Sequence, residues 1–228
     1  MKFVVFDFDH TLFDADSGTK LVKWLIQRSW WRVLLAVLVA PLAAPLIAFI
    51  PTRRYGISVF VWIGTLGLHD EAEVNRTIDL YVDENISDLR KLFMPAALAQ
   101  FNEHLAAGDT VIVATGAPTE LARKLMREVT QEKIRVIGTI LGPILGGMHA
   151  IQHCHNENKL VMMRAHGYDA PIDIAYTDSF ADLPLALAAA HPVIVNPKSS
   201  SVDDFRRALP AGTPIVWWGA HGRAGDRV

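Results

Sequence analysis

Short apolar runs recur along the chain, and segments with a helical pattern separate them. The runs that we predict as strands are residues 2–6, 111–115, 134–138, 172–178 and 192–196. Their length and their Val and Ile content are typical of buried strands in a parallel sheet. Between two of them, Leu98, Phe101 and Leu105 repeat with a helical period, and Gly108 favours a helix end. This alternation predicts an α/β fold with a doubly wound parallel sheet, whose ligands bind beyond the carboxyl ends of the strands.

Residues 14–92 interrupt the alternation. They have a helical composition without a clear strand, and they lie between the first two predicted strands. We therefore predict an inserted helical cap at 14–92 and an α/β core formed by 1–13 and 93–218. The polar, glycine-containing tail at 219–228 is expected to be poorly ordered.

Two parts of the predicted cap carry no charged residue. Residues 33–50 form an apolar run of 18 residues, close to the length of a membrane-spanning helix. The core segments on either side of the cap belong to one sheet, so any membrane crossings must be even in number. The second run, residues 55–68, would form a helix of about 21 Å, which is short of the roughly 30 Å hydrocarbon core. A shallow insertion of residues 30–68, bent at Pro41 and Pro45, fits better than a span.

The residues around these runs also favour a membrane surface. Four tryptophans, Trp24, Trp30, Trp31 and Trp62, lie in this region, and tryptophan favours the membrane interface. The flanking arginines are Arg28, Arg32, Arg53 and Arg54. The alternative is that the apolar runs form the core of the cap or a dimer interface.

The composition and net charge limit the partners and the cellular location that we expect for the protein. Hydrophobic residues make up 51% of the 228 residues, and the mean hydropathy of +0.23 is high for a soluble domain. The net charge of −2 indicates no basic surface for nucleic acid. One cysteine excludes a disulfide within the chain, and the first residues, MKFVVFDFDHTL, do not resemble a signal peptide. We expect a cytoplasmic protein, peripheral on the cytoplasmic face of a membrane.

The first candidate site follows the first predicted strand. Asp7, Asp9 and Thr11 alternate and so face the same way in an extended segment. A single aspartate at a strand end is explained by a turn cap, but two carboxylates that converge repel each other unless a cation joins them.

A second acidic pair, Asp178 and Asp182, follows the strand at 172–178. A helix cap by Asp178 or Ser179, with Asp182 compensating the helix dipole, is the structural alternative. Together the two pairs make a hard, oxygen-rich site that suits Mg²⁺ rather than zinc.

Two further features would suit a bound phosphate. Thr115 and Gly116 end the strand at 111–115 before a helix that begins near Pro118, and such a helix start can bind anions. Lys159 lies at the start of another predicted helix. Alone, the first would be an ordinary turn and the second a solvated lysine. A phosphate dianion beside four carboxylates needs a cation, and this requirement favours Lys159 as its partner.

Another group of residues, His149, His153, Cys154 and His155, could suggest zinc or copper. No second set with ligand spacing occurs elsewhere in the sequence, so we expect this segment to be a loop or hairpin.

The motifs and their order resemble the haloacid dehalogenase (HAD) superfamily of phosphotransferases. The matching pieces are DFDHT (7–11), the strand ending at Thr115, Lys159, and TDSFAD (177–182). The position of the cap and VNP (195–197) resemble the phosphoserine phosphatase-like subfamily. The apolar cap with VWIGTLGLHDEAE (61–73) is most similar to phosphatidylglycerophosphatase C and its relatives. The chain departs from the usual pattern with His10 in place of glycine and with NEN before Lys159.

The resemblance implies a mechanism. Asp7 would form a phosphoaspartyl intermediate, and Asp9 would first protonate the leaving alcohol and then deprotonate water. The expected phosphate-binding residues are Thr11, Thr115, Gly116 and Lys159. Mg²⁺ would be held by Asp7, Asp178 and the backbone carbonyl of Asp9, with support from Ser179 and Asp182.

The substrate implied is a phosphomonoester, and a lipid phosphate such as phosphatidylglycerol phosphate would suit the apolar cap. One alternative is a small soluble phosphomonoester similar to phosphoserine. Another is a non-catalytic module that binds a membrane or a partner. Loss of Asp7 or Asp9 would support such a module, and both residues are present.

Overall fold

The computed structural model describes residues 1–49, 52–130 and 132–219. Ile50 of the apolar run and residues 220–228 of the predicted tail lie outside the described residues, as do the side chains of Arg53 and Arg54.

A seven-stranded sheet forms the centre of the α/β part, in the order β4-β3-β2-β1-β5-β6-β7. The strands are β1 (Phe3–Phe6), β2 (Thr110–Pro118), β3 (Arg135–Ile144), β4 (Gly147–Gln152), β5 (Ile172–Thr177), β6 (Ala189–Val195) and β7 (Ile215–Val216). Every neighbouring pair is parallel except β3 and β4. The predicted α/β fold and its predominantly parallel sheet are therefore confirmed.

Side chains of the central strand alternate between two hydrophobic layers. Val4 and Phe6 pack in the layer that includes Phe101 of α5 (Pro95–Ala106) and Leu121 of α6 (Thr119–Arg127). Phe3 and Val5 pack in the opposite layer, with residues of α7 (Glu157–Ala165) and α8 (Leu183–Ala188). A last helix, α9 (Ser199–Ala208), contributes to a smaller cluster. Successive side chains of β1 point to opposite faces of the sheet, and both faces are covered by apolar residues.

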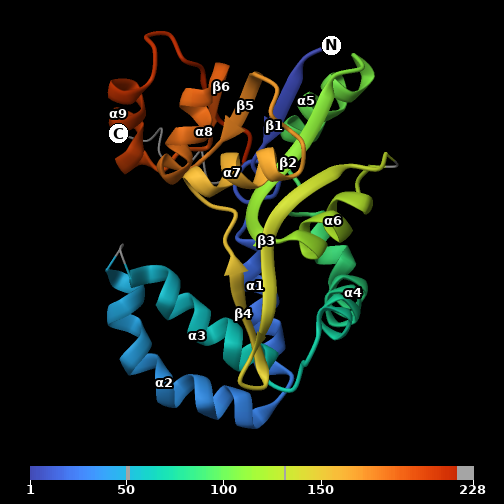
Figure 1. Cartoon of the computed structure of the whole chain (residues 1–228), viewed down its shortest axis with the longest axis vertical. Coiled ribbons are helices and arrows are strands. Elements are labelled where there is room, and N and C mark those ends of the chain that lie inside the picture. Colours follow the sequence, from blue (N-terminus) through green and yellow to red (C-terminus); the bar gives the residue numbers. More distant parts are fainter. Residues whose placement is uncertain (50–51, 131, 220–228) are drawn as a thin grey trace.

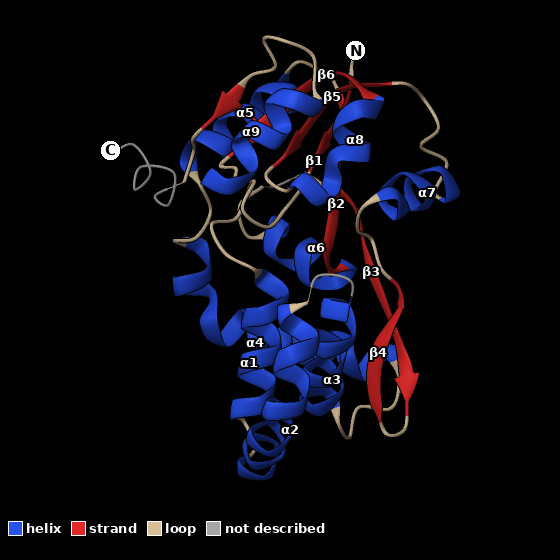
Figure 2. Ribbon diagram, turned by 90° about the vertical axis from the view of Figure 1, so that its left-hand side faces the viewer, coloured by secondary structure: helices blue, strands red, loops and turns tan. Residues whose placement is uncertain are grey.

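In the described part of the chain, four helices lie between β1 and α5. They are α1 (Ser17–Gln27), α2 (Trp30–Ala48), α3 (Arg53–Thr65) and α4 (Glu71–Arg90). Figure 1 shows them below the carboxyl ends of the central strands, with α2 at the bottom of the view and α3 beside β4. The cap boundaries 14–92 stay a prediction, because the long β3–β4 hairpin also reaches down to these helices (Figures 1 and 2).

The β3–β4 hairpin is longer than the predicted strand at 134–138. Beyond Thr139, β3 leaves its partner β2 and pairs with β4 out to Ile144 and Gly147. Its end lies against α3, where Trp62 Nε1 donates to the Ile144 carbonyl at 3.1 Å. The sequence indicated a loop or hairpin here, and these tertiary contacts support the added strand length.

Helix α2 is exposed over most of its surface. Within the described residues it is the one helix long and apolar enough to cross a membrane by length and composition, with a mean hydropathy of 2.0. Its buried residue is Ala43. The helix packs on α3 at Gly56, where an added Cβ would lie 2.5 Å from an Ile47 side-chain carbon and 3.1 Å from the Ala43 carbonyl oxygen. The helix is continuous through Pro41 and Pro45.

Two of the arginines expected to flank the apolar run bind protein groups. Arg28 forms an ion pair with Glu84 at 2.8 Å. Arg32 donates to the Leu25 carbonyl at 3.2 Å and also to the Leu66 carbonyl. Their spacing in the sequence could not distinguish these partners from lipid head groups.

Candidate active site

Asp7 follows β1 and is held by backbone contacts on both sides. Its N–H donates to the Tyr176 carbonyl of β5 at 2.9 Å. Its Oδ1 accepts from the Phe8 N–H at 2.7 Å and lies 2.9 Å from Lys159 Nζ. The residue is 6% exposed, and burial raises its pKa well above the usual value, against the opposing effect of Lys159. A carboxylate fixed in this way can attack a substrate with little loss of conformational freedom.

Lys159 connects Asp7 to Asp182. It lies in the first turn of α7, is 1% exposed, and places Nζ 2.6 Å from Asp182 Oδ2. Burial alone would lower its pKa, but the two carboxylates outweigh burial and raise the pKa. Asn156 caps the helix with a φ of 56°, and its N–H donates to Asp182 Oδ1 at 3.2 Å. The NEN segment therefore provides a helix start that places Lys159 inside the site.

Asp9 meets the N-terminus of α1. The Ser17 N–H donates to Asp9 Oδ1 at 2.9 Å. Burial, reinforced by the Asp16 charge, raises the pKa of Asp9 to about 7, although the Ser17 hydrogen bonds oppose this rise. A group with this pKa can give and take a proton near neutral pH. Sequence reasoning did not single out Ser17; the available signal was Asp16, which caps α1 through the Thr19 N–H at 2.6 Å.

Asp178 and Asp182 differ in their surroundings although they are close in sequence. Burial, together with the Asp182 charge, raises the pKa of Asp178 to about 7, against the effect of Lys159. Burial would also raise the pKa of Asp182, but Lys159 and its hydrogen bonds lower it. Ser179 caps a 3₁₀ turn (Phe180–Asp182) by accepting from the Ala181 N–H at 3.3 Å, so the capping alternative applies to this residue.

The predicted phosphate-binding residues are not equally accessible. Thr115 is buried, and its Oγ1 accepts from the Ala117 N–H at 3.1 Å. Gly116 is exposed and lies within β2, which continues to Pro118 instead of ending at the predicted residue 115, and α6 begins at Thr119. Thr11 is fully buried, and its Oγ1 has no hydrogen-bond partner in the described part of the chain. The structure thus joins Asp7, Lys159 and Asp182 directly, whereas the Thr11 hydroxyl forms no hydrogen bond with them.

The histidine- and cysteine-containing segment has other contacts. His149 Nδ1 lies 3.1 Å from the Gly142 carbonyl oxygen, and burial raises the pKa of the Cys154 thiol to about 12. His155 Nδ1 lies 4.0 Å from Asp182 Oδ1. Across residues 1–49, 52–130 and 132–219, no three or more His, Cys, Asp or Glu residues form a group that could hold a metal. The predicted Mg²⁺ ligands are a smaller set of side chains, because Asp9 would contribute its backbone carbonyl.

The charges of the acidic residues and of Lys159 indicate whether Mg²⁺ would fit this site. If the carboxyl groups of Asp7, Asp178 and Asp182 are all ionised, the single positive charge of Lys159 leaves them incompletely neutralised. The raised pKa values of Asp7 and Asp178 reflect burial and this repulsion. Carboxylate and carbonyl oxygens are the ligands that Mg²⁺ prefers. A divalent cation of this kind matches both the donors and the missing charge.

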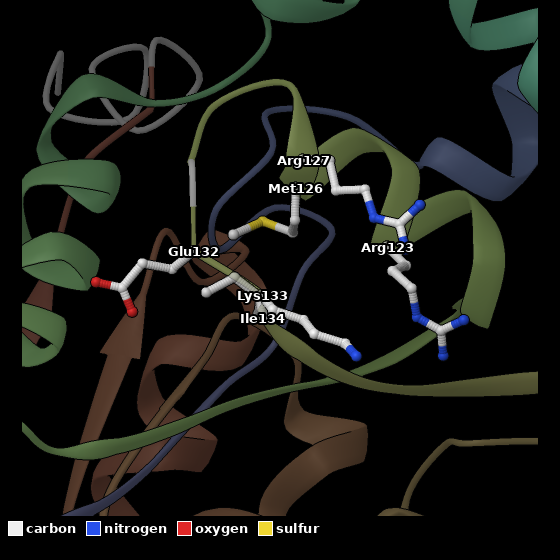
Figure 3. Close-up of a pocket in the computed structure, with 6 residues that line it drawn as sticks. All are labelled: Arg123, Met126, Arg127, Glu132, Lys133 and Ile134. Atoms are coloured by element: carbon white, nitrogen blue, oxygen red, sulfur yellow. The ribbon is translucent and has the colours of Figure 1, made fainter.

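Two cavities lie away from these carboxylates. Figure 3 shows one of about 40 Å³ that is formed by the end of α6 and the segment before β3. The other, of about 450 Å³, is lined by residues of α9 and the segment before β7. Neither is lined by a predicted site residue.

Comparison with solved structures shows the same fold in several proteins. A protein of unknown function from Bordetella pertussis Tohama I aligns with a TM-score of 0.71 and 19% identity, covering 95% of this chain and 98% of that one. A phosphoserine phosphohydrolase-like protein from Francisella tularensis aligns with a TM-score of 0.56 and 16% identity over 98% of each chain. A phospho-aspartyl intermediate analogue of phosphoserine phosphatase aligns with a TM-score of 0.55 and 14% identity, covering 98% and 96%.

No curated protein sequence matches the chain. The profile of the haloacid dehalogenase-like hydrolase family matches residues 4–187, which contain all of the acidic residues described above and Lys159. This match covers most of the chain and agrees with the observed fold. The protein therefore belongs to the haloacid dehalogenase-like hydrolase family.

Proposed function

We propose that the protein is a magnesium-dependent phosphatase that hydrolyses phosphomonoesters through a phosphoaspartyl intermediate on Asp7. The observation that carries this proposal is the buried Asp7–Lys159–Asp182 network at the end of β1, with Asp9 two residues further on. Similar folds in phosphoserine phosphatase and in a phosphoserine phosphohydrolase-like protein support the same reaction class.

In the first step, a carboxylate oxygen of Asp7 attacks the phosphorus of the substrate. A new bond forms between that oxygen and phosphorus, and the bond between phosphorus and the alcohol oxygen breaks. Asp9 gives its proton to the departing alcohol, and its raised pKa keeps that proton available near neutral pH. The products of this step are the free alcohol and a phosphorylated Asp7.

In the second step, Asp9 accepts a proton from water, whose oxygen attacks the phosphorus of the phosphoaspartate. The bond to Asp7 breaks, inorganic phosphate leaves, and the carboxylate is restored. The phosphoryl oxygens would be held by Thr11, Thr115, Gly116 and Lys159. Asp7, Asp178 and the Asp9 carbonyl would hold Mg²⁺, with Ser179 and Asp182 steadying this arrangement. The bound cation supplies charge neutralisation at the phosphoryl group.

We propose a lipid phosphate, such as phosphatidylglycerol phosphate, as the substrate. The support is the apolar surface of α2, most of which is exposed although α2 belongs to the helices below the catalytic strand ends. Residues 30–68 would contact the membrane surface, and the cap at 14–92 would cover the head group over the core at 1–13 and 93–218. The protein would then act as a peripheral enzyme at the cytoplasmic face.

A phosphatase screen in Mg²⁺ buffer tests both levels of this proposal. It compares phosphatidylglycerol phosphate in detergent with soluble phosphomonoesters, phosphoserine among them. The wild type and Asp169→Asn, a change at an exposed aspartate, should release phosphate, whereas Asp7→Asn should not. Release from soluble esters alone would reject the lipid substrate and retain the phosphatase. Equal release by Asp7→Asn would reject the mechanism.

A further inference from the structure

The turn of the β3–β4 hairpin carries an exposed apolar side chain in an unusual conformation. Leu145 and Gly146 join the paired residues Ile144 and Gly147, and both have positive φ, 44° and 76°. Two-residue turns of this kind favour Asn or Asp followed by Gly, because a branched side chain is disfavoured at positive φ. Leu145 is nevertheless 86% exposed. Neither turn preference nor packing within the chain explains a leucine at this position.

The turn is fixed in place against α3. Trp62 Nε1 donates to the Leu145 carbonyl at 3.3 Å as well as to Ile144, and the Gly67 N–H donates to the Gly146 carbonyl at 2.7 Å. The Met148 N–H donates to Thr65 Oγ1 at 2.8 Å. Leu145 is therefore held on a rigid support and presented outwards.

Helix α2 presents an apolar stripe at the same end of the molecule. Trp30, Leu34, Leu38 and Leu42 repeat every four residues, which places them along one side of the helix, and all are exposed. Trp30 is 79% exposed and Leu42 is 76% exposed. Figures 1 and 2 both show the hairpin turn and α2 at the end of the molecule opposite the N-terminus.

The two sequence segments that contain these elements carry basic residues but no acidic ones. Residues 17–69 contain no Asp or Glu, and neither do residues 133–156, although the chain has 24 acidic residues. In contrast, α4 carries Glu71, Glu73, Asp79, Asp83, Glu84 and Asp88. Arg28 pairs with Glu84, but two copies of this surface would still bring the other basic residues of these segments close to one another. An anionic bilayer would instead accept both the apolar stripe and the positive charge.

We infer that the Leu145 turn and the Trp30–Leu42 stripe form one composite surface that docks on an anionic lipid bilayer. The inference rests on the membrane contact proposed above and extends it to a hairpin about 100 residues away in sequence, which continues a strand of the core sheet. Because the other side of α2 packs on α3 at Gly56, the helix lies along the bilayer rather than across it. Docking at two places fixes the tilt of the whole molecule on the membrane.

Co-sedimentation with vesicles of equal parts phosphatidylcholine and phosphatidylglycerol tests the inference. The decisive variant is Leu145→Asn, because asparagine suits the turn and should keep or raise the melting temperature. Because Leu145 would be buried in the bilayer on docking, its replacement should weaken vesicle binding roughly tenfold. Leu42→Asn should weaken binding similarly. The matched control is Leu187→Asn on α8 in the core, where the leucine is 58% exposed, and it should bind like the wild type.

Unchanged binding by Leu145→Asn, or an equal loss in Leu187→Asn, would overturn the composite surface. Wild-type protein that ignores vesicles and forms a dimer disrupted by Leu145→Asn would overturn it in favour of a second copy of the chain. Hydrolysis of a soluble phosphomonoester, measured in parallel, should be the same for the wild type and all three variants. Its absence in every protein would count against the phosphatase proposal while leaving the binding comparison intact.

Discussion

Lys159 shows how a residue that is ordinary in sequence becomes central in the folded chain. It is buried between the carboxylates of Asp7 and Asp182, at 2.9 and 2.6 Å. Burial of a charged lysine is costly unless opposite charges lie beside it. Here two carboxylates lie beside one ammonium group, which is more negative charge than the lysine needs. Burial, together with the charge of Asp182, raises the pKa values of Asp7 and Asp178. These buried carboxyl groups lower the stability of the metal-free protein when they ionise, and the proposed Mg²⁺ would offset that loss.

The substitution Asp178→Asn tests how much the ionised carboxylate of Asp178 lowers stability. Because the pKa of Asp178 rises from 3.8 to about 7 on folding, the wild type loses stability as pH rises from about 4 to about 7 and stays at the lower level above that range. Without metal, Asp178→Asn should melt a few degrees higher than the wild type at pH 8, about 2–4 °C for each kcal/mol, with the difference shrinking towards pH 5. Thermal unfolding in EDTA, with Asp169→Asn as the exposed control, checks this. A lower melting temperature for Asp178→Asn at pH 8 would count against it.

Among the helices and strands, those features that depend on local sequence were predicted correctly. The strands of the parallel sheet are buried on both sides, so their Val and Ile content marks them, and the helix α5 ends before Gly108, whose φ is 75°. The β3 extension depends on contacts with Trp62 and Thr65, which lie more than 70 residues earlier, so local pattern could not define it. The Ser17 contact with Asp9 was missed for a different reason: Asp16 marks the start of α1, but sequence alone does not show which side chain the Ser17 N–H contacts.

Gly147 offers a test of how firmly the hairpin is attached to α3. A Cβ at this position would lie 2.8 Å from Trp62 Cδ1 and 2.9 Å from the Trp62 carbonyl oxygen. Gly147→Ala should therefore displace the hairpin and destabilise the fold by about 1–3 kcal/mol. Gly18→Ala is the control, since its Cβ would meet no atom closer than 3.7 Å. Thermal unfolding checks the prediction, and an equal melting temperature for Gly147→Ala and the wild type would show that the contact is loose.

In the whole molecule, the exposed apolar side chains of α2 lie at one end, away from the enclosed core sheet. The core sheet is enclosed by two helical layers, whereas α2 leaves apolar side chains exposed at the far end. Hydropathy identified residues 33–50 as an unusually apolar run. It could not show whether these side chains form the core of the cap or an exposed surface, because either would be apolar. The fold around Gly56 resolves this, since α3 covers only one side of α2.

Mg²⁺ should stabilise the whole protein as well as activate it. A cation that binds only the folded state raises stability with its concentration. We expect the melting temperature to rise with added Mg²⁺ in the wild type and much less in Asp178→Asn, and activity to disappear in EDTA. Ca²⁺ should compete but support little turnover, because it takes more ligands at longer distances. Full activity in metal-free buffer would contradict the proposed site.

The most direct test of the central claim is to detect the phosphoryl group on Asp7. The enzyme would be mixed with a phosphomonoester that it hydrolyses and with Mg²⁺, quenched rapidly in acid, and analysed by peptide mass spectrometry. The account predicts a mass increase of one phosphoryl group on the peptide carrying DFDHT, assigned to Asp7, and no such increase in Asp7→Asn. Phosphorylation of another residue during turnover, or turnover by Asp7→Asn at the wild-type rate, would contradict the account.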